Sequence, residues 1–266
     1  MKRHENTADA RVTADDQKTM RRIRLKRAVT RALAVLASVC LFVSVVFTCI
    51  EAVAFDEGRY KALYNEFGIL SDTGLDSMDS LMGITHELLA YCRGDRDNLD
   101  MQAVISGETR EVFNTREKEH MVDVQRLFVK GYKIRLVAVI CLLFLLLLLV
   151  YVARRRTQRE LAHGWLYAVT ALGALLAAVG VAFAVNFDWA WTQFHYIFFT
   201  NDLWLLYQDD MLILMLLKLF SSIVRAVILW SAVALAVLTA GAAAVARLDR
   251  KKKLRKAERN EPEPQA

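Results

Sequence analysis

The sequence lacks the short motifs that mark several large classes of enzyme. It contains no GxSxG nucleophile elbow, no P-loop and no glycine-rich dinucleotide signature, and its serines and cysteines stand in no nucleophile motif. The four cysteines make no disulfide framework, because only Cys92 lies outside an apolar run. Proline is nearly absent, and the two that exist, Pro262 and Pro264, lie in the C-terminal tail. These absences leave no sign of an enzyme nucleophile, a nucleotide site or a disulfide-stabilised domain.

Long apolar runs are the main feature that is present. Hydrophobic residues make up 55% of the 266 residues. Four runs reach the ~20 residues with which a helix, rising ~1.5 Å per residue, crosses ~30 Å of hydrocarbon. They predict membrane spans at 32–55, 133–153, 165–187 and 223–246. An integral membrane protein fits this composition better than one or two soluble domains.

The distribution of Lys and Arg predicts the orientation of these spans. Ten lie in the leader 1–31, four in the link 154–164 and eight in the tail 247–266. The domain 56–132 has nine bases against fifteen acids, and the segment 188–222 has one base against four acids. Because basic loops stay inside, both termini and the link are expected in the cytoplasm and the two acidic segments outside it. The net charge of +6 therefore indicates topology and contact with membrane lipid headgroups, and predicts no nucleic-acid partner.

The extracytoplasmic domain 56–132 is predicted to be mainly helical. Apolar residues fall at helical spacing and make one buried face, namely Leu81, Ile84, Leu88, Leu89 and Cys92. Gly94 follows as a stop signal. Asn114 or Thr115 is expected to cap the next helix, with Glu117 in its first turn. A short strand was the alternative for residues 57–70.

The segment 188–222 is rich in aromatic residues, as expected at a headgroup interface. Its two apolar pieces, each about ten residues, are too short to span a bilayer. We expect a pair of interfacial or re-entrant helices that roofs a cavity. Together these patterns predict an all-α membrane protein with four transmembrane helices, both termini inside, a mainly helical extracytoplasmic domain between spans 1 and 2, and this interfacial segment between spans 3 and 4.

The most informative polar stretch is FNTREKEHMVDV, residues 113–124. Asp123 stands three residues after His120, so on a helix its carboxylate can reach the imidazole and raise its basicity, as a general base needs. The alternative is an ordinary ion pair on a helix surface. Glu117, His120 and Asp123 also have ligand character, but no second His/Cys-rich motif accompanies them, so no metal and no cofactor are predicted.

Two other histidines are expected on the outer side. His195 lies among aromatic residues that include Phe194 and Phe198, where it either anchors the protein at the interface or serves a site. His86 is expected to be solvated, because it points away from the apolar face of its helix.

Three stretches resemble a bacterial membrane-protein family that includes the lipoprotein intramolecular transacylases. They are HELLAYCRGD (86–95), FNTREKEHMVDVQRLF (113–128) and FHYIFFTNDLWLL (194–206), and the resemblance covers roughly 32–246. It implies a multi-pass protein of the bacterial cytoplasmic membrane with its active side extracytoplasmic. The stretch 206–220 departs from the family pattern because it contains no proline, so the resemblance implies the fold more strongly than the substrate.

The resemblance implies a reaction and two histidines that carry it. The sn-2 acyl chain of a diacylglyceryl-cysteine lipoprotein would move to the α-amino group of the same cysteine. By motif, the two histidines fall on His120 and His195. His120, oriented by Asp123, would act as general base and then acid, opposite His195. The remaining candidates are supporting groups: Arg126 and Asn201 for an oxyanion or headgroup, and Phe194 and Phe198 for acyl chains.

Two other functions compete with this one. A non-catalytic membrane adaptor or sensor could bind a partner through the acidic domain 56–132. A small-molecule transporter is disfavoured, because no ionisable residue lies near the middle of a predicted span and only Glu51 comes close to one end.

Overall fold

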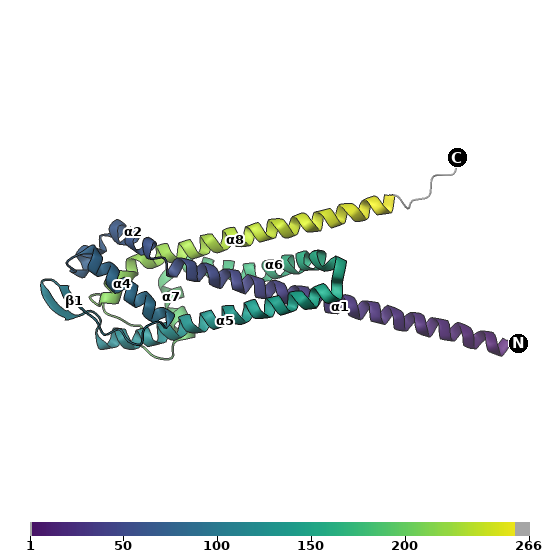
Figure 1. The fold of residues 1–266 in the computed structure, drawn as a ribbon, viewed down its shortest axis with the longest axis horizontal. Coiled ribbons are helices and arrows are strands. Elements are labelled where there is room, and N and C mark those ends of the chain that lie inside the picture. The colour runs from purple at the N-terminus through teal and green to yellow at the C-terminus, as the bar shows by residue number, and fades with distance from the viewer. Residues whose placement is uncertain (1, 259–266) are drawn as a thin grey trace. The chain divides into compact units, whose positions relative to one another are not determined.

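The computed structural model describes residues 2–258, and four long helices dominate it (Figure 1). They are α1 (Lys2–Ala54), α5 (Thr115–Ala153), α6 (Thr157–Val185) and α8 (Met211–Glu258). Each of the four contains a stretch long and apolar enough to cross a membrane, which confirms the prediction of four spans. Two of them continue into the basic segments, because neither α1 nor the last turns of α8 contain a proline or glycine to end the helix.

The predicted link 154–164 is largely helical. A single 3₁₀ turn, η1 (Arg154–Arg156), separates α5 from α6. Gly164 of α6 lies at a close contact between helices. A Cβ on Gly164 would lie 2.7 Å from the carbonyl of Ala34 in α1, so close helix packing explains why a glycine stands there. Next to it, Trp165 donates its indole N–H to Thr239 of α8 at 3.0 Å.

The domain between the first two spans is mainly helical, as predicted. It comprises α2 (Glu57–Phe67), α3 (Ile69–Thr73) and α4 (Met78–Arg93), followed by a hairpin of β1 (Gln102–Ile105) and β2 (Glu108–Glu111). Residues 57–70 form helix, so the strand considered there is not formed. The hairpin turn has Ser106 at φ 54° and Gly107 at φ 85°, the two positive φ values that match the twist of paired strands.

The core of this domain gathers around α4. Leu81, Leu88 and Cys92 are buried, as their helical spacing predicted. Gly94 ends α4 with φ 86°, a left-handed conformation that glycine adopts without strain. The same cluster includes Met215 of α8, so the first turns of α8 belong to this core.

The segment after α6 differs in part from the expected pair of interfacial helices. α7 (Phe187–Phe198) is a separate helix, capped by Asn186, which accepts from the Trp189 amide. The second apolar piece, however, is continuous with the fourth span in α8. The physical reason is that the polar residues before Met211 break the helix, whereas no proline or glycine interrupts α8 before Gly241.

Candidate functional site

The N-terminus of α5 is held by reciprocal capping. Asn114 Oδ1 accepts from the Glu117 amide at 3.0 Å, and Glu117 Oε2 accepts from the Asn114 amide at 2.8 Å. The other carboxylate oxygen of Glu117 accepts from the Leu212 amide at 2.7 Å. This carboxyl is 1% exposed, and burial together with nearby Asp210 raises its pKa. The cap therefore joins the start of α5 to the start of α8.

One turn further along α5, His120 meets His195 of α7. Their ring centroids lie 6.3 Å apart, so the structure brings together the two histidines that the resemblance singled out. His195 is 3% exposed. Its Nδ1–H donates to the Trp191 carbonyl at 2.8 Å, which leaves Nε2 as the free acceptor of the neutral ring. His86 is elsewhere, exposed and hydrogen-bonded to Glu57 at 2.9 Å.

Both histidines of the pair are kept neutral. Burial, reinforced by the neighbouring His195, lowers the pKa of His120 to about 4, and the charge of Asp123 only partly opposes this. Burial also lowers the pKa of His195. His120 lies in the charged first turns of α5, before the apolar segment 133–153. At neutral pH each imidazole can therefore accept a proton.

Asp123 binds other partners than the sequence suggested. Its Oδ1 accepts from Arg126 at 3.0 Å and its Oδ2 accepts from Asn201 at 2.8 Å. Within residues 2–258 no hydrogen bond joins it to His120, so it acts on that ring through its charge alone. Its structural role is to tie α5 to the loop that follows α7.

That loop carries a residue which the sequence reasoning missed, Trp204. Its ring stacks on His195 at 4.5 Å and 27°. Arg116 Nη2 donates to the Asp202 carbonyl at 2.6 Å and Asn201 accepts from the Leu203 amide at 3.1 Å, so the loop is held in place. The Trp204 Nε1–H is shielded from solvent and has no hydrogen-bond partner within the described residues. The sequence offered one signal for Trp204, namely its position in the stretch 194–206. There it follows a polar turn that brings the chain back towards His195.

An apolar cavity of about 800 Å³ lies beside the histidine pair. Five predicted site residues line it, namely Asp123, Arg126, Asn201, Phe194 and Phe198. The rest of its wall is largely apolar and includes Phe47, Ile50, Phe55, Leu127, Phe128 and Ile134. Phe199 also lines the cavity, and its ring contacts His120 and His195 with centroids 5.7 Å and 5.4 Å away, so this side chain stands between the cavity and the pair.

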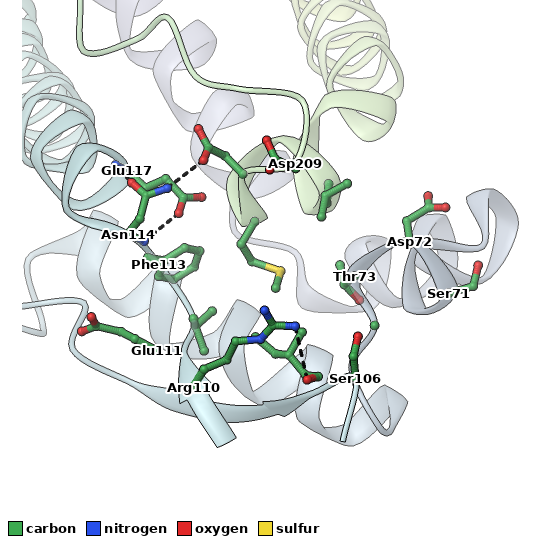
Figure 2. A pocket seen from close by; sticks show the side chains of 16 residues that line it. Ser71, Asp72, Thr73, Ser106, Arg110, Glu111, Phe113, Asn114, Glu117 and Asp209 are labelled. Carbon is green, nitrogen blue, oxygen red and sulfur yellow. Dashed lines mark hydrogen bonds between the residues drawn. The ribbon is translucent and has the colours of Figure 1, made fainter. Parts of the chain in front are cut away.

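A second cavity, of about 680 Å³, is polar (Figure 2). We call it the polar cleft. Asn114, which caps α5, and Glu117 of α5 face Thr73 and Ser106 across it, and Arg110 extends between them. Its other polar lining residues are Ser71, Asp72, Glu111, Asp209 and Asp210. It was not anticipated from the sequence, because its walls come from four separate segments.

The three potential metal ligands of the first turns of α5 do not form a site. Glu117 binds backbone amides and Asp123 binds Arg126 and Asn201. In the described part of the chain, no group of three or more His, Cys, Asp or Glu side chains is placed to hold a metal ion.

The chain is similar to proteins of one known family. The family model for the lipoprotein intramolecular transacylase Lit matches residues 35–220. No curated protein matches the chain. Solved structures of the membrane-integral lipoprotein intramolecular transacylase Lit from Bacillus cereus are similar in fold. Two variants with one substituted histidine have TM-scores of 0.64 and 0.65 at 17% and 18% identity, and cover 90% and 88% of this chain and 99% of their own. A further Lit structure has a TM-score of 0.60 at 18% identity, covering 87% of this chain and 99% of its own.

Proposed function

The chain belongs to the lipoprotein intramolecular transacylase Lit family, and on that premise we propose that it moves the sn-2 acyl chain of a diacylglyceryl-cysteine lipoprotein to the α-amino group of the same cysteine. A C–N bond forms, the ester C–O bond breaks, and one proton passes from the amine to the glycerol oxygen. The substrate supplies its own nucleophile, which accounts for the missing serine and cysteine motifs.

The observation that carries this mechanism is the neutral pair of half-buried His120 and buried His195. A neutral imidazole can take the proton that the amine loses on attack. Because burial lowers the pKa of His120 to about 4, its protonated form is more acidic than an ordinary imidazolium and readily returns the proton to the leaving glycerol oxygen. His195 presents Nε2 as an acceptor and stands opposite, where it stabilises the positive charge that develops on the attacking amine or shares the proton.

The tetrahedral intermediate also needs a hydrogen-bond donor for its oxyanion. Arg126 and Asn201 are the candidates from sequence, and each donates one hydrogen bond to Asp123 and keeps further N–H groups for a substrate. The Trp204 Nε1–H has no partner within the described residues and belongs to a ring in contact with His195. A shielded donor without an acceptor is costly by ~1–3 kcal/mol, and a substrate carbonyl would relieve that cost. We therefore add Trp204 as a third candidate donor.

The apolar cavity is the proposed place for acyl chains. Phe194, Phe198 and Phe55 offer aromatic surface, and Arg126 and Asn201 stand at its polar edge. A site lined this way excludes water, whose attack on the ester is the competing reaction. The basic ends of the chain support an arrangement in the bacterial cytoplasmic membrane with this site on the extracytoplasmic side.

The test is expression in a bacterium whose lipoproteins are all diacylated, followed by mass spectrometry of lipoprotein N-terminal peptides. The wild-type protein is expected to produce the N-acyl, lyso form. Variants His120→Ala and His195→Ala should not produce it, whereas His86→Ala, which changes an exposed histidine outside the site, should behave as wild type. An unchanged diacylglyceryl N-terminus with well-expressed wild-type protein would overturn the proposal.

A further inference from the structure

We propose that the polar cleft binds the polypeptide that follows the lipidated cysteine, and that it favours basic over acidic residues there. This inference rests on the proposed function and extends it to the protein part of the substrate. It begins from the position of the cleft along α5.

Residues of α5 and its N-terminal cap line both cavities, and His120 lies between these two sets of residues along the helix. Asn114 and Glu117 line the polar cleft, whereas Asp123 and Leu127 line the apolar cavity. At ~1.5 Å per residue, Glu117 precedes His120 and Asp123 follows it by ~4.5 Å each along the helix axis. A substrate whose reacting group reaches His120 therefore has a polar cavity on one side and an apolar cavity on the other.

The substrate has the same division. Its acyl chains are apolar, its polypeptide is polar, and the reacting amine and ester join the two. When the acyl chains occupy the apolar cavity, the polypeptide leaves His120 towards the N-terminus of α5, where the cleft lies. About 680 Å³ falls within the ~300–1,000 Å³ of sites that hold whole ligands, which is enough for a few residues.

The cleft also offers groups that bind a peptide backbone. Arg110 and Glu111 of β2 line the cleft. Arg110 Nη2 donates to the Ile105 carbonyl at 3.4 Å, and the other N–H groups of its guanidinium can donate to main-chain carbonyls of a bound peptide. The hydroxyls of Ser71 and Ser106 on the far wall add side-chain partners.

Charge indicates which peptide fits. Most acids of the cleft are already engaged: Asp72 with Lys218, Glu111 with Lys118 and Asp210 with Asn114. Asp209 is exposed and makes no ion pair or side-chain hydrogen bond within the described residues. Its carboxylate is thus available to a Lys or Arg of the bound peptide. Arg110 is the one base among the lining residues and binds the Ile105 carbonyl, against five acids, so the charge of the lining favours a basic peptide and repels an acidic one.

The experiment uses the full-length enzyme in detergent or vesicles and synthetic diacylglyceryl-cysteine lipopeptides with identical acyl chains. The four residues after the cysteine are Lys-Ser-Lys-Ser, Glu-Ser-Glu-Ser or all Ser, and a diacylglyceryl-cysteine amide without a peptide is included. Conversion is followed by mass spectrometry. We expect kcat/KM to be highest for the Lys peptide, with roughly threefold per charge between Lys and Glu peptides at low salt, the size of an exposed ion pair, and the difference should shrink as salt is added.

The variant Asp209→Lys reverses one charge at an exposed position and should reverse the preference, with the effect in KM. Glu66→Lys makes the same charge change on exposed α2, outside the cleft, and should leave the preference intact. Equal rates for the three peptides, or a preference that Asp209→Lys does not alter, would overturn the inference while the wild-type conversion still supports the proposed function. If no lipopeptide is converted, the proposed function itself fails.

Discussion

The polar cleft and the apolar cavity have similar volumes but opposite chemistry, and both open onto α5. The cleft takes its walls from the end of α3, the β-hairpin, the N-terminus of α5 and the start of α8. The cavity takes its walls from the end of α1, the first half of α5, the end of α7 and the loop after it. His120 lies on α5 between the two sets of lining residues. The comparison shows how one helix can direct the two halves of an amphiphilic substrate in opposite directions from a single reacting centre.

The largest effect is expected from removing the centre that separates the two cavities. His120→Ala should lower kcat by at least ~10²-fold, the contribution of a positioned general base, and His195→Ala by a similar factor. Because the two rings act as a unit, the double variant should be little worse than either single one. Rates that multiply in the double variant would show that the histidines act independently. Single-turnover lipopeptide assays give these values.

Trp204→Phe tests the donor at the same boundary. Phe keeps an aromatic ring to stack on His195 but removes the N–H together with the five-membered ring of the indole, so kcat should fall by ~10²-fold with KM nearly unchanged. Tyr196 also contacts Trp204, edge-on with centroids 5.7 Å apart. Tyr196→Phe is therefore the matched control and should retain activity. A fully active Trp204→Phe enzyme would remove Trp204 from the mechanism.

Gly131→Leu alters the cavity alone. A Cβ at Gly131 would lie 3.2 Å from the Phe47 ring, and the rest of a leucine side chain would take up space in the cavity that both residues line. Long acyl chains should then lose about tenfold in kcat/KM, the cost of ~1.4 kcal/mol of lost packing, and short chains less. Preference among lipopeptides should stay as in wild type, because the polar cleft is untouched. Equal losses for long and short chains would contradict the assignment of the cavity.

The pH dependence should show the smallest change. The attacking α-amino group, with a pKa of about 7.7–8.0, must be neutral, so kcat/KM falls below that pH. His120 must be neutral too, and because its pKa is lowered to about 4, a second fall is expected only near that pH and not near 6.5. Asp123→Asn removes the charge that holds the pKa up, so it should move the second fall to still lower pH. A break near 6.5 in the wild-type profile would show that the base is a solvated histidine.

Much of the fold could be predicted because it is encoded locally. Apolar runs of membrane length gave four spans, and the spacing of Leu81, Leu88 and Cys92 gave the buried face of α4. Asn114 capped α5 as its side chain predicts. These features depend on neighbouring residues in one helix, so periodicity and capping rules reach them. The continuity of α8 was not predicted. The second apolar piece of the segment 188–222 was expected to form a separate helix, but it is continuous with the fourth span.

The sequence allowed the candidate residues of the site to be named, but not the contacts between them. Resemblance pointed to His120 and His195, and the cavity gathers Asp123, Arg126, Asn201, Phe194 and Phe198. The partners were different: Asp123 binds Arg126 and Asn201 rather than His120. A carboxylate at helical spacing can reach the imidazole, but stronger charge-assisted donors from its own helix and from a distant loop compete for it.

By itself, the sequence determined the four membrane-length helices, the caps of α4 and α5, and the residue types available for acyl transfer, because these follow from hydrophobicity and local backbone chemistry. Only the tertiary structure decided that His120 and His195 lie 6.3 Å apart, that Trp204 covers His195, and that a polar and an apolar cavity flank one helix. Each of these depends on the packing of α5 against α7, α8 and the loops between them, which brings together segments that no local pattern connects.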